Sequence, residues 1–386
     1  MRNHVFFASC PRGLEPYLAS EITALGGTDP KLLGGGVSFS GPWNLILKIN
    51  LESRLASRLL WKISHDIYQN ENDIYTLARN VRWSNYFDVH HSLMVKVEAH
   101  RCPLKSLDFA TLRIKDGICD RFRMDTGLRP DIKTNSPQVR VHAFLSENTA
   151  TLYLDTSGQP LFQRQLKPYS GEAPLKENLA AGILAITGWN GEECLYDPMC
   201  GSGTILLEAI MQALDIPPGF KRDFAFERLH AFDSSTWSRL RESRLSNCKP
   251  LGSMNIFGSD ISGDAIELSR KNLKVAGFEQ YVQLKQVNFI ESSPPASSGI
   301  IIANLPYGFR MDLSQSPNLL YPKLGDILKQ KYSGWRAFFL TADYVNMIKS
   351  VRLSASKRTP LFNGPIECRL LEYKIIAGSN RKPANS

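Results

Sequence analysis

Asp197-Pro-Met-Cys-Gly-Ser-Gly-Thr204 is the stretch that decides the fold, because it joins an apolar strand to an apolar helix. Gly201 and Gly203 allow a tight turn and let the backbone approach a ligand, as happens at the carboxyl ends of strands in nucleotide-binding α/β folds. A Gly-x-Gly pair also suits any tight turn between a strand and a helix. The segments on either side must therefore decide between a binding turn and a plain one.

Strands and helices alternate on both sides of this turn, which is typical of an α/β domain with a mostly parallel sheet. The expected strands are Glu193–Asp197, Asn255–Asp260, Tyr281–Val287, Gly299–Asn304, Arg336–Leu340 and Cys368–Ile376, and the expected helices include Thr204–Leu214 and Asp264–Ala276. Residues 215–253 break the alternation and are interpreted as an insertion on the sheet. The domain is predicted over residues 165–377, with a disordered tail at 378–386.

An acidic residue ends the second strand, in Gly258-Ser-Asp260. A carboxylate at this place can accept hydrogen bonds from the ribose hydroxyls of an adenosine. A dinucleotide fingerprint would place its acid about 20 residues after the glycines and would add a third glycine. Asp260 lies much further along and the third glycine is missing, which favours S-adenosylmethionine over a nicotinamide dinucleotide.

The fourth strand ends in Ile300-Ile-Ile-Ala-Asn304-Leu-Pro-Tyr307-Gly. The exocyclic nitrogen of adenine or guanine is a poor nucleophile, because its lone pair is delocalised into the ring. The Asn304 oxygen and a backbone carbonyl near Pro306 can accept its two N–H groups and direct the lone pair at a methyl group. Tyr307 offers a flat face to a base removed from its stack. We interpret this motif as catalytic rather than as a simple turn, because it ends a strand of a sheet that already has a cofactor turn.

The first 160 residues have a mixed α and β pattern. A strand at His4–Cys10 precedes a helix, and two later strands at Gln138–Phe144 and Ala150–Asp155 predict a hairpin. The cluster Ser157-Gly-Gln-Pro160 is typical of a domain boundary. No catalytic motif is found in this half.

Several strings of the sequence resemble the THUMP-domain methyltransferases of bacterial 23S ribosomal RNA, which modify guanine N2. The strings are Phe7-Ala-Ser-Cys-Pro-Arg-Gly-Leu-Glu15, Arg54-Leu-Ala-Ser-Arg58, Lys115-Asp-Gly-Ile118, Gly171-Glu-Ala-Pro-Leu-Lys-Glu-Asn-Leu-Ala-Ala181, Asp197–Ala209 and Asn304–Arg310. The resemblance implies a ferredoxin-like domain over residues 1–60, a THUMP RNA-binding domain over 61–160 and a Rossmann-like methyltransferase domain over 165–377. Leu305 departs from the family pattern, in which a second proline stands there.

The resemblance also assigns roles to single residues. The catalytic set is Asn304, Pro306 and Tyr307. The expected contacts of S-adenosylmethionine are Pro174, Leu175, Asp197, Pro198, Cys200, Gly201, Gly203, Thr204, Asp260, Ile261, Asn288 and Phe289. Asn288 stands where an acid commonly contacts the adenine amino group, and its amide oxygen can accept the same hydrogen bond. The expected partner is 23S ribosomal RNA or a large-subunit precursor.

The bulk properties fit this interpretation. The net charge of +9 is spread along the chain, with 20 Lys and Arg against 16 Asp and Glu in residues 1–164 and 26 against 21 in the remainder. Folded surfaces are therefore expected to meet a polyanion. Seven cysteines without a C-x-x-C pair, together with the lack of a signal or membrane segment, predict a cytoplasmic protein without a metal site. The oligomeric state is left open.

Three alternatives stay open at this stage. An RNA or DNA adenine-N6 methyltransferase could use the same Asn-x-Pro-Tyr motif. A non-catalytic RNA-binding assembly factor could keep the fold, although the intact motif residues argue against it. A nicotinamide oxidoreductase lacks the third glycine and an evident acid–base pair.

Overall fold

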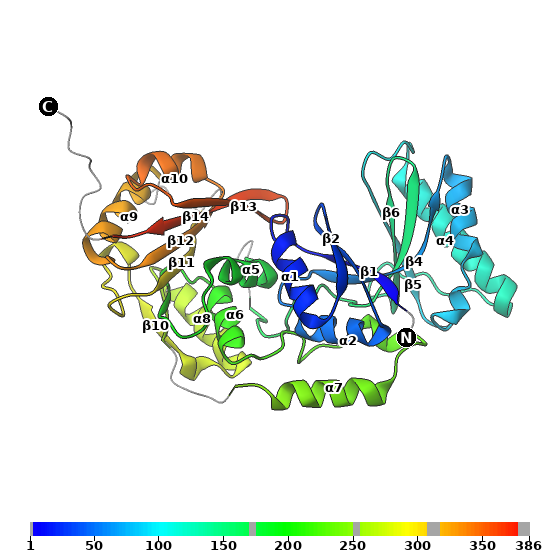
Figure 1. The fold of residues 1–386 in the computed structure, drawn as a ribbon, viewed down its shortest axis with the longest axis horizontal. Helices are drawn as coiled ribbons and strands as arrows, with labels where there is room; N and C mark the ends of the chain where they lie inside the picture. Colours follow the sequence, from blue (N-terminus) through cyan, green and yellow to red (C-terminus); the bar gives the residue numbers. More distant parts are fainter. Residues whose placement is uncertain (1–2, 170–174, 250–254, 307–316, 377–386) are drawn as a thin grey trace. The chain divides into compact units, whose positions relative to one another are not determined.

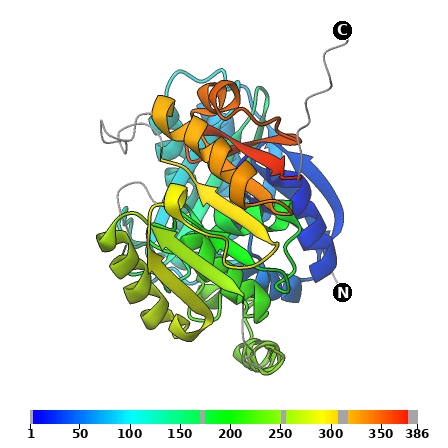
Figure 2. The same cartoon turned by 90° about the vertical axis from the view of Figure 1, so that its left-hand side faces the viewer.

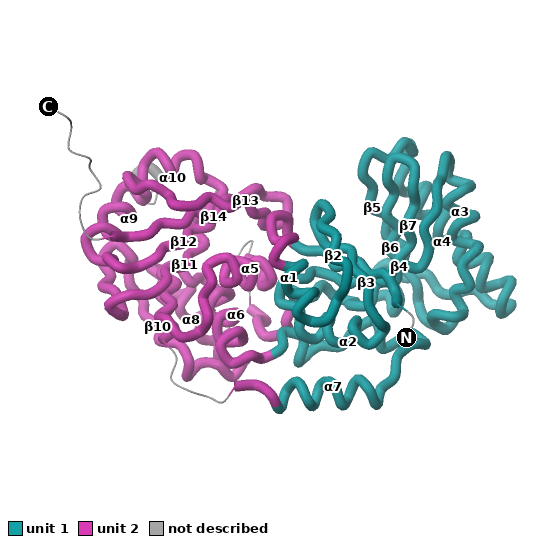
Figure 3. Tube along the Cα trace, in the orientation of Figure 1, with its two compact units in different colours: residues 1–10, 18–163, 217–246 teal, residues 11–17, 164–216, 247–386 magenta. Residues whose placement is uncertain are grey.

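The computed structural model describes residues 3–169, 175–249, 255–306 and 317–376, without the side chains of 317–319. The chain forms two compact units (Figure 3). Unit 1 contains residues 1–10, 18–163 and 217–246, and unit 2 contains residues 11–17, 164–216 and 247–386. Each unit has its own seven-stranded sheet. No helix in the described part of the chain is long and apolar enough to cross a membrane.

The sheet of unit 1 has the strand order β2-β3-β1-β4-β7-β6-β5. Its strands are β1 (His4–Ser9), β2 (Thr28–Leu33), β3 (Gly36–Gly41), β4 (Arg58–Ile67), β5 (Leu93–Ala99), β6 (Val139–Leu145) and β7 (Thr149–Asp155). β4 is shared between two parts of the sheet, because it pairs with β1 at its start and with β7 along its later length. β6 and β7 form the predicted hairpin.

The described residues of unit 1 form the helices α1 (Glu15–Leu25), α2 (Trp43–Glu52), α3 (Glu71–Asn80), α4 (Leu107–Thr126) and α7 (Ser234–Ser246), with the short 3-10 turns η1 (Trp83–Asn85) and η2 (Ala225–Arg228). The first residues of α1 belong to unit 2. α3 begins with a capping box in which Asn70 and Asp73 satisfy each other's backbone N–H groups. α4 ends at Gly127, whose φ of 76° suits a left-handed helix end. Local sequence signals therefore set these boundaries.

Residues 217–246 differ from the expectation that residues 215–253 form an insertion on the sheet of the methyltransferase domain. They belong to unit 1, where the Gly219 N–H donates to the Leu51 carbonyl at 2.9 Å. The buried Arg222 guanidinium donates to the carbonyls of Gln159, Pro160 and Gln163. These partners lie far away in the sequence, so hydropathy patterning gave no sign of them.

The sheet of unit 2 has the strand order β10-β9-β8-β11-β12-β14-β13. Its strands are β8 (Leu195–Asp197), β9 (Ile256–Asp260), β10 (Val282–Gln286), β11 (Ile300–Asn304), β12 (Arg336–Thr341), β13 (Lys357–Asn363) and β14 (Ile366–Lys374). The first five are parallel, and β14 runs antiparallel to β12 and β13. The predicted α/β fold is confirmed. Chain order reverses between β8 and β11, which is where doubly wound sheets bind ligands.

Helices cover both faces of this sheet (Figures 1 and 2). Their bounds are α5 (Glu177–Thr187), α6 (Thr204–Ala213), α8 (Gly263–Ala276), α9 (Pro317–Lys331) and α10 (Tyr344–Ser350), with 3-10 turns η3 (Glu279–Tyr281) and η4 (Phe289–Glu291). α6 and α8 pack on β9. On the opposite face, residues of α9 and α10 enclose a buried apolar cluster with β11 and β12. The central strands that carry the motifs are thus buried between helices.

Candidate functional site

The turn after β8 has the shape that its glycines predict. Gly201 and Gly203 have φ angles of 53° and 79°, in the left-handed region that favours glycine. Gly203 is also the residue from which α6 starts. A Cβ atom on Gly201 would meet no atom within 4 Å, so the space beside this backbone is open in the described structure. An open glycine backbone at a helix start is a surface to which a ligand can come close.

Asp260 holds this turn from the neighbouring strand. Its Oδ2 accepts the Gly201 N–H at 3.0 Å, and its Oδ1 accepts the Ser262 N–H at 3.0 Å. A carboxylate oxygen has a second acceptor position, so both oxygens keep capacity for ligand hydroxyls. Sequence analysis predicted a ligand role for Asp260 and did not anticipate its role in shaping the turn.

Two polar residues of α8 support the turn from behind, and sequence analysis missed both. Ser269 Oγ donates to the Gly201 carbonyl at 2.7 Å, and Asn272 Nδ2 donates to the Ser202 carbonyl at 3.0 Å. Both side chains are fully buried. The available signal was the presence of polar residues on the inward face of an amphipathic helix, where they need hydrogen-bond partners.

Thr204 and Lys167 meet at the start of α6. Lys167 Nζ lies 2.8 Å from Thr204 Oγ1 and 3.4 Å from Glu177 Oε1. The Lys167 side chain is only 5% exposed, so its charge acts in a largely dry environment. The Thr204 hydroxyl is thereby fixed next to the glycine turn.

Asp197 lies at the end of β8 and is almost completely buried. Its Oδ1 accepts the Met199 N–H at 3.2 Å. Burial raises the pKa of the Asp197 carboxyl well above its usual range, and the nearby charge of Asp260 adds to this effect. Burial likewise raises the pKa of the Cys200 thiol, which makes it a poor nucleophile. A cationic ligand group next to Asp197 would favour the ionised carboxylate.

The second part of the site lies at the end of β11, between β8 and β12. The Leu305 N–H donates to the Leu340 carbonyl at 3.0 Å, and the Leu305 side chain is fully buried. Asn304 Oδ1 is buried and has no hydrogen-bond partner among the described residues. A buried acceptor without a partner costs free energy, so its retention at a strand end favours a role in ligand binding. Tyr307 lies outside the described residues.

The remaining predicted contacts are spread over different environments. Pro198 and Leu175 are buried, Pro306 is half-buried and Ile261 is 51% exposed. Asn288 Oδ1 already accepts the Ile290 N–H at 3.2 Å, where it starts η4. The Phe289 side chain is buried between Tyr196 and Tyr332, so it packs in the core. Pro174 lies outside the described residues, and these assignments stay predictions.

Among the described residues, no group of three or more His, Cys, Asp or Glu side chains is arranged to hold a metal ion. The expectation of a protein without a metal stays a prediction.

Three family models match consecutive parts of the chain. The model of an RMKL-like methyltransferase domain matches residues 164–372, that of a THUMP domain matches 68–155 and that of an RlmL ferredoxin-like domain matches 5–60. The predicted family resemblance is confirmed. The models do not test the exact domain limits.

Two curated relatives are named ribosomal RNA large subunit methyltransferase K/L. The protein from Psychromonas ingrahamii is 36% identical over 98% of this chain and 51% of its own length. The protein from Shewanella oneidensis is 35% identical over 98% of this chain and 54% of its own length. The chain therefore spans about half the length of these relatives.

Solved structures with high similarity cover nearly the whole chain. The crystal structure of SMU.472 complexed with SAH has a TM-score of 0.88 and 27% identity, covering 98% of this chain and 100% of that one. A predicted N6-adenine-specific DNA methylase from Listeria monocytogenes has a TM-score of 0.87 and 26% identity, covering 97% of each chain. Together with the glycine turn and the Asn304 strand end, these matches show that the chain belongs to the family of RMKL-like methyltransferases.

Proposed function

We propose that this chain transfers the methyl group of S-adenosylmethionine to the N2 amino group of a guanosine in 23S ribosomal RNA. The observation that carries the proposal is the buried, unpartnered Asn304 Oδ1 at the end of β11. This acceptor lies at the carboxyl end of β11, next to β8, where the chain order of the sheet reverses. The glycine turn follows the carboxyl end of β8.

S-adenosylmethionine fits the residues around the turn. Its ribose hydroxyls can donate to the remaining acceptor positions of Asp260, and its amino acid cation can lie near Asp197. The open space beside Gly201 admits a ligand without steric conflict. The related SMU.472 structure contains SAH, the product of the same cofactor. S-adenosylmethionine supplies an electrophilic methyl group to the site.

The protein's own residues activate the amine. Asn304 Oδ1 accepts one N–H of the guanine amino group, and the backbone carbonyl at Leu305 or Pro306 accepts the other. Two accepted hydrogen bonds localise the nitrogen lone pair and stabilise the positive charge that develops on nitrogen. With S-adenosylmethionine bound, the methyl carbon would bond to the amino nitrogen as its bond to sulfur breaks, S-adenosylhomocysteine would leave, and the nitrogen would release a proton to water. No strong base is required, because the amine becomes acidic only after methylation.

The rest of the rate acceleration comes from residues that position the guanine base at the strand end. The strand end is held by the Leu305–Leu340 backbone hydrogen bond and by the buried Leu305 side chain. Pro306 restricts the backbone direction that follows. We assign Tyr307 to stacking against the flipped base. Leu305 keeps a backbone carbonyl as an acceptor, although the family pattern that the sequence resembles has a proline there.

RNA recognition belongs, in this proposal, to the ferredoxin-like and THUMP parts over residues 1–60 and 61–160. The reaction belongs to residues 165–377, apart from the segment 217–246 that packs in unit 1. The substrate assignment rests on the THUMP match and on the names of the curated relatives. Because the substrate is 23S ribosomal RNA or a large-subunit precursor, we place the protein in the cytoplasm.

Adenine N6 is the second candidate acceptor. The Listeria monocytogenes relative is titled a predicted N6-adenine-specific DNA methylase, and both amines present two N–H groups to an Asn-x-Pro-Tyr motif. A non-catalytic assembly factor is the candidate from another class. The retained Asn304 acceptor and the glycine turn favour an enzyme over it.

A methylation assay separates these candidates. The purified chain is incubated with methyl-labelled S-adenosylmethionine and unmodified 23S ribosomal RNA, and the RNA is digested to nucleosides for mass spectrometry. The proposal expects N2-methylguanosine with the wild type and a large loss with Asn304→Ala. N6-methyladenosine as the product would select the second candidate. Bound RNA without any methylated nucleoside would support the assembly factor.

A further inference from the structure

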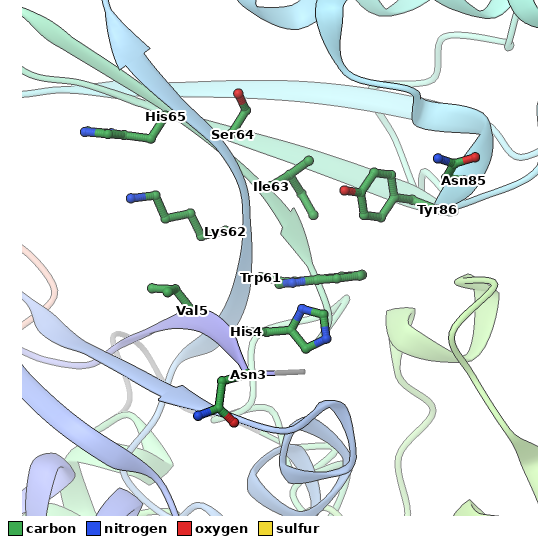
Figure 4. Close-up of a pocket in the computed structure, with 10 residues that line it drawn as sticks. All are labelled: Asn3, His4, Val5, Trp61, Lys62, Ile63, Ser64, His65, Asn85 and Tyr86. Carbon is green, nitrogen blue, oxygen red and sulfur yellow. The ribbon is translucent and has the colours of Figure 1, made fainter. Parts of the chain in front are cut away.

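A cavity of about 490 Å³ lies in unit 1, and its lining residues belong neither to the glycine turn nor to the Asn304 strand end. It is lined by ten residues from three stretches of sequence, residues 3–5, 61–65 and 85–86 (Figure 4). Its volume is within the range of small-molecule pockets. The stretches come from β1 with the residue before it, from β4, and from η1 with the residue after it.

The cavity exists because the sheet forks at this point. β1 pairs with β4 only from Phe6 opposite Trp61 to Ser9 opposite Arg58. His4 and Val5 pair with β3 alone, while the later part of β4 pairs with β7. The facing edges of β1 and β4 therefore separate at this point.

A bulge in β4 coincides with the fork. The pairing register with β7 shifts between Lys62 and Ser64, so that Ile63 is an extra residue. Bulges bend a strand and redirect side chains, and they are common beside functional sites. Lys62 and His65 project to one side of β4, and Trp61, Ile63 and Tyr86 lie on the other (Figure 4).

Aromatic rings form one wall of the cavity. The rings of His4 and Trp61 meet edge to face at 5.1 Å, and those of Trp61 and Tyr86 meet at 5.1 Å and 73°. Trp61 is 8% exposed and packs on Trp43, whereas His4 and Tyr86 are half-buried. The Tyr86 backbone is fixed by bonds to Trp83 and His230. The partly exposed rings are thus held in place before a ligand binds.

The other lining groups suit a nucleotide. Asn3 and Asn85 provide amide donors and acceptors, and Lys62 provides a positive charge. Among the lining residues that the structure describes, none is a carboxylate. Stacking rings, amide groups and a cation are the groups that bind unpaired bases and their phosphates, and the stacking rings favour a nucleotide over an acidic peptide strand.

We propose that the fork between β1 and β4 binds one unpaired nucleotide of the RNA substrate. The base stacks on the rings of His4 or Tyr86, the amides of Asn3 and Asn85 contact its edge, and Lys62 meets a phosphate. This inference rests on the proposed function, since it takes RNA to be the substrate. It adds an RNA contact outside the reaction site.

RNA affinity tests the proposal directly. Binding of a fluorescently labelled 23S ribosomal RNA transcript is measured for the wild type, His4→Ala, Tyr86→Ala and Tyr86→Phe. Tyr86→Ala and His4→Ala should each weaken binding about tenfold, and Tyr86→Phe should keep most of the affinity because it keeps the ring. The matched control is Phe144→Ala, which removes a ring that is 42% exposed on β6 and does not line the cavity.

The readouts separate this inference from the proposed function. All variants should bind S-adenosylmethionine as the wild type does, and at saturating RNA they should keep the wild-type methylation rate. Photo-crosslinking of 4-thiouridine-containing transcript should give RNA adducts on peptides that contain residues 3–5, 61–65 or 85–86. A wild type that binds and crosslinks RNA here but methylates nothing would contradict the proposed function and leave the fork site standing.

Two results would overturn the fork site. One is unchanged RNA affinity in folded His4→Ala and Tyr86→Ala, with circular dichroism and melting temperature close to the wild type. The other is an equal loss of affinity in Phe144→Ala, which would indicate a general loss of RNA contact surface. Capture of a peptide strand by the fork, with no RNA adducts, would also contradict the assignment.

Discussion

The glycine turn in unit 2 and the fork cavity in unit 1 are built in opposite ways. The turn is made of consecutive residues from Asp197 to Thr204, and its shape depends on backbone angles that only glycine adopts easily. The cavity collects side chains from three distant stretches, and its shape depends on where β1 and β4 separate. A contiguous site leaves a motif in the sequence, whereas a site made by strand divergence leaves none.

The two regions also differ in the hydrogen bonds that their polar groups form in the described structure. Around the turn, the backbone groups of Gly201 and Ser202 and the carboxylate of Asp260 are engaged in hydrogen bonds. In the fork, the separated edges of β1 and β4 are not paired with each other. The turn is therefore held in shape by hydrogen bonds, whereas the rings of the fork are held by packing against one another.

The largest expected effect is on the chemical step. Asn304→Ala should lower kcat by ~10²–10³, because it removes an acceptor that stabilises charge only as the reaction proceeds. Affinity for S-adenosylmethionine should stay near the wild-type value, as measured by calorimetry. Asn304→Asp keeps an acceptor at the same place and should retain more activity than the alanine variant. Wild-type turnover by Asn304→Ala would show that the strand end is only a turn.

The second largest effect is expected when Gly201 in the turn is replaced. Gly201→Ala forces an alanine into a left-handed conformation at a cost of about 1–2 kcal/mol, and its Cβ fills the space assigned to the cofactor. Gly188→Ala is a matched control, because Gly188 has a φ of 71° and an equally open surrounding at the end of α5. Both variants should lose stability.

Only Gly201→Ala should also lose affinity for S-adenosylmethionine, by about tenfold or more, which corresponds to about 1.4 kcal/mol. Calorimetric titration and thermal melting of the two variants provide the comparison. Equal cofactor affinity in both would mean that the turn is a structural link and holds no ligand.

A smaller effect follows from the burial of Asp197. Because its pKa is raised in the folded protein, the folded state binds a proton more tightly than the unfolded chain does. Stability is therefore lost as pH rises from the ordinary carboxyl pKa of about 4 through the raised value. Asp197→Asn avoids this cost and can still accept the Met199 N–H.

At pH 7.5, Asp197→Asn should melt above the wild type, with a smaller difference near pH 4, because the buried carboxyl loses its stabilising proton as the pH rises. It should bind S-adenosylmethionine less tightly, because a neutral amide attracts the ligand's cation less. Asp233→Asn should change the melting temperature in the opposite direction and melt below the wild type at pH 7.5. Hydrogen bonds from Thr236 and Ser235 lower the pKa of Asp233 to about 2, so the ionised carboxylate stabilises the fold. A lower melting temperature for Asp197→Asn at pH 7.5 would contradict the argument.

The smallest effect concerns the charge in the fork. Lys62→Ala should reduce the slope of log affinity against log salt by about 0.7, the contribution of one phosphate contact on a single strand. Lys96→Ala is the control, because Lys96 is 52% exposed and paired with Glu98 at 2.6 Å. RNA titrations at several salt concentrations measure both slopes. An unchanged slope for Lys62→Ala would show that Lys62 does not contact a phosphate of the RNA.

The sequence by itself determined the fold class, the alternating elements of unit 2 and the positions of Gly201, Gly203, Asp260 and Asn304 at strand ends. It could do so because hydrophobic period, glycine spacing and strand-end polarity are local properties of the chain. The family resemblance extended this to the THUMP and ferredoxin-like parts, and the domain models confirm it.

Only the tertiary structure decided the features that depend on distant partners. It placed residues 217–246 in unit 1 through hydrogen bonds such as Gly219 to Leu51, and it buried Phe289 in the core. It brought Ser269 and Asn272 behind the turn and opened the fork between β1 and β4. Long-range contacts arise from packing and strand pairing across the whole chain, and no local pattern of residues specifies them.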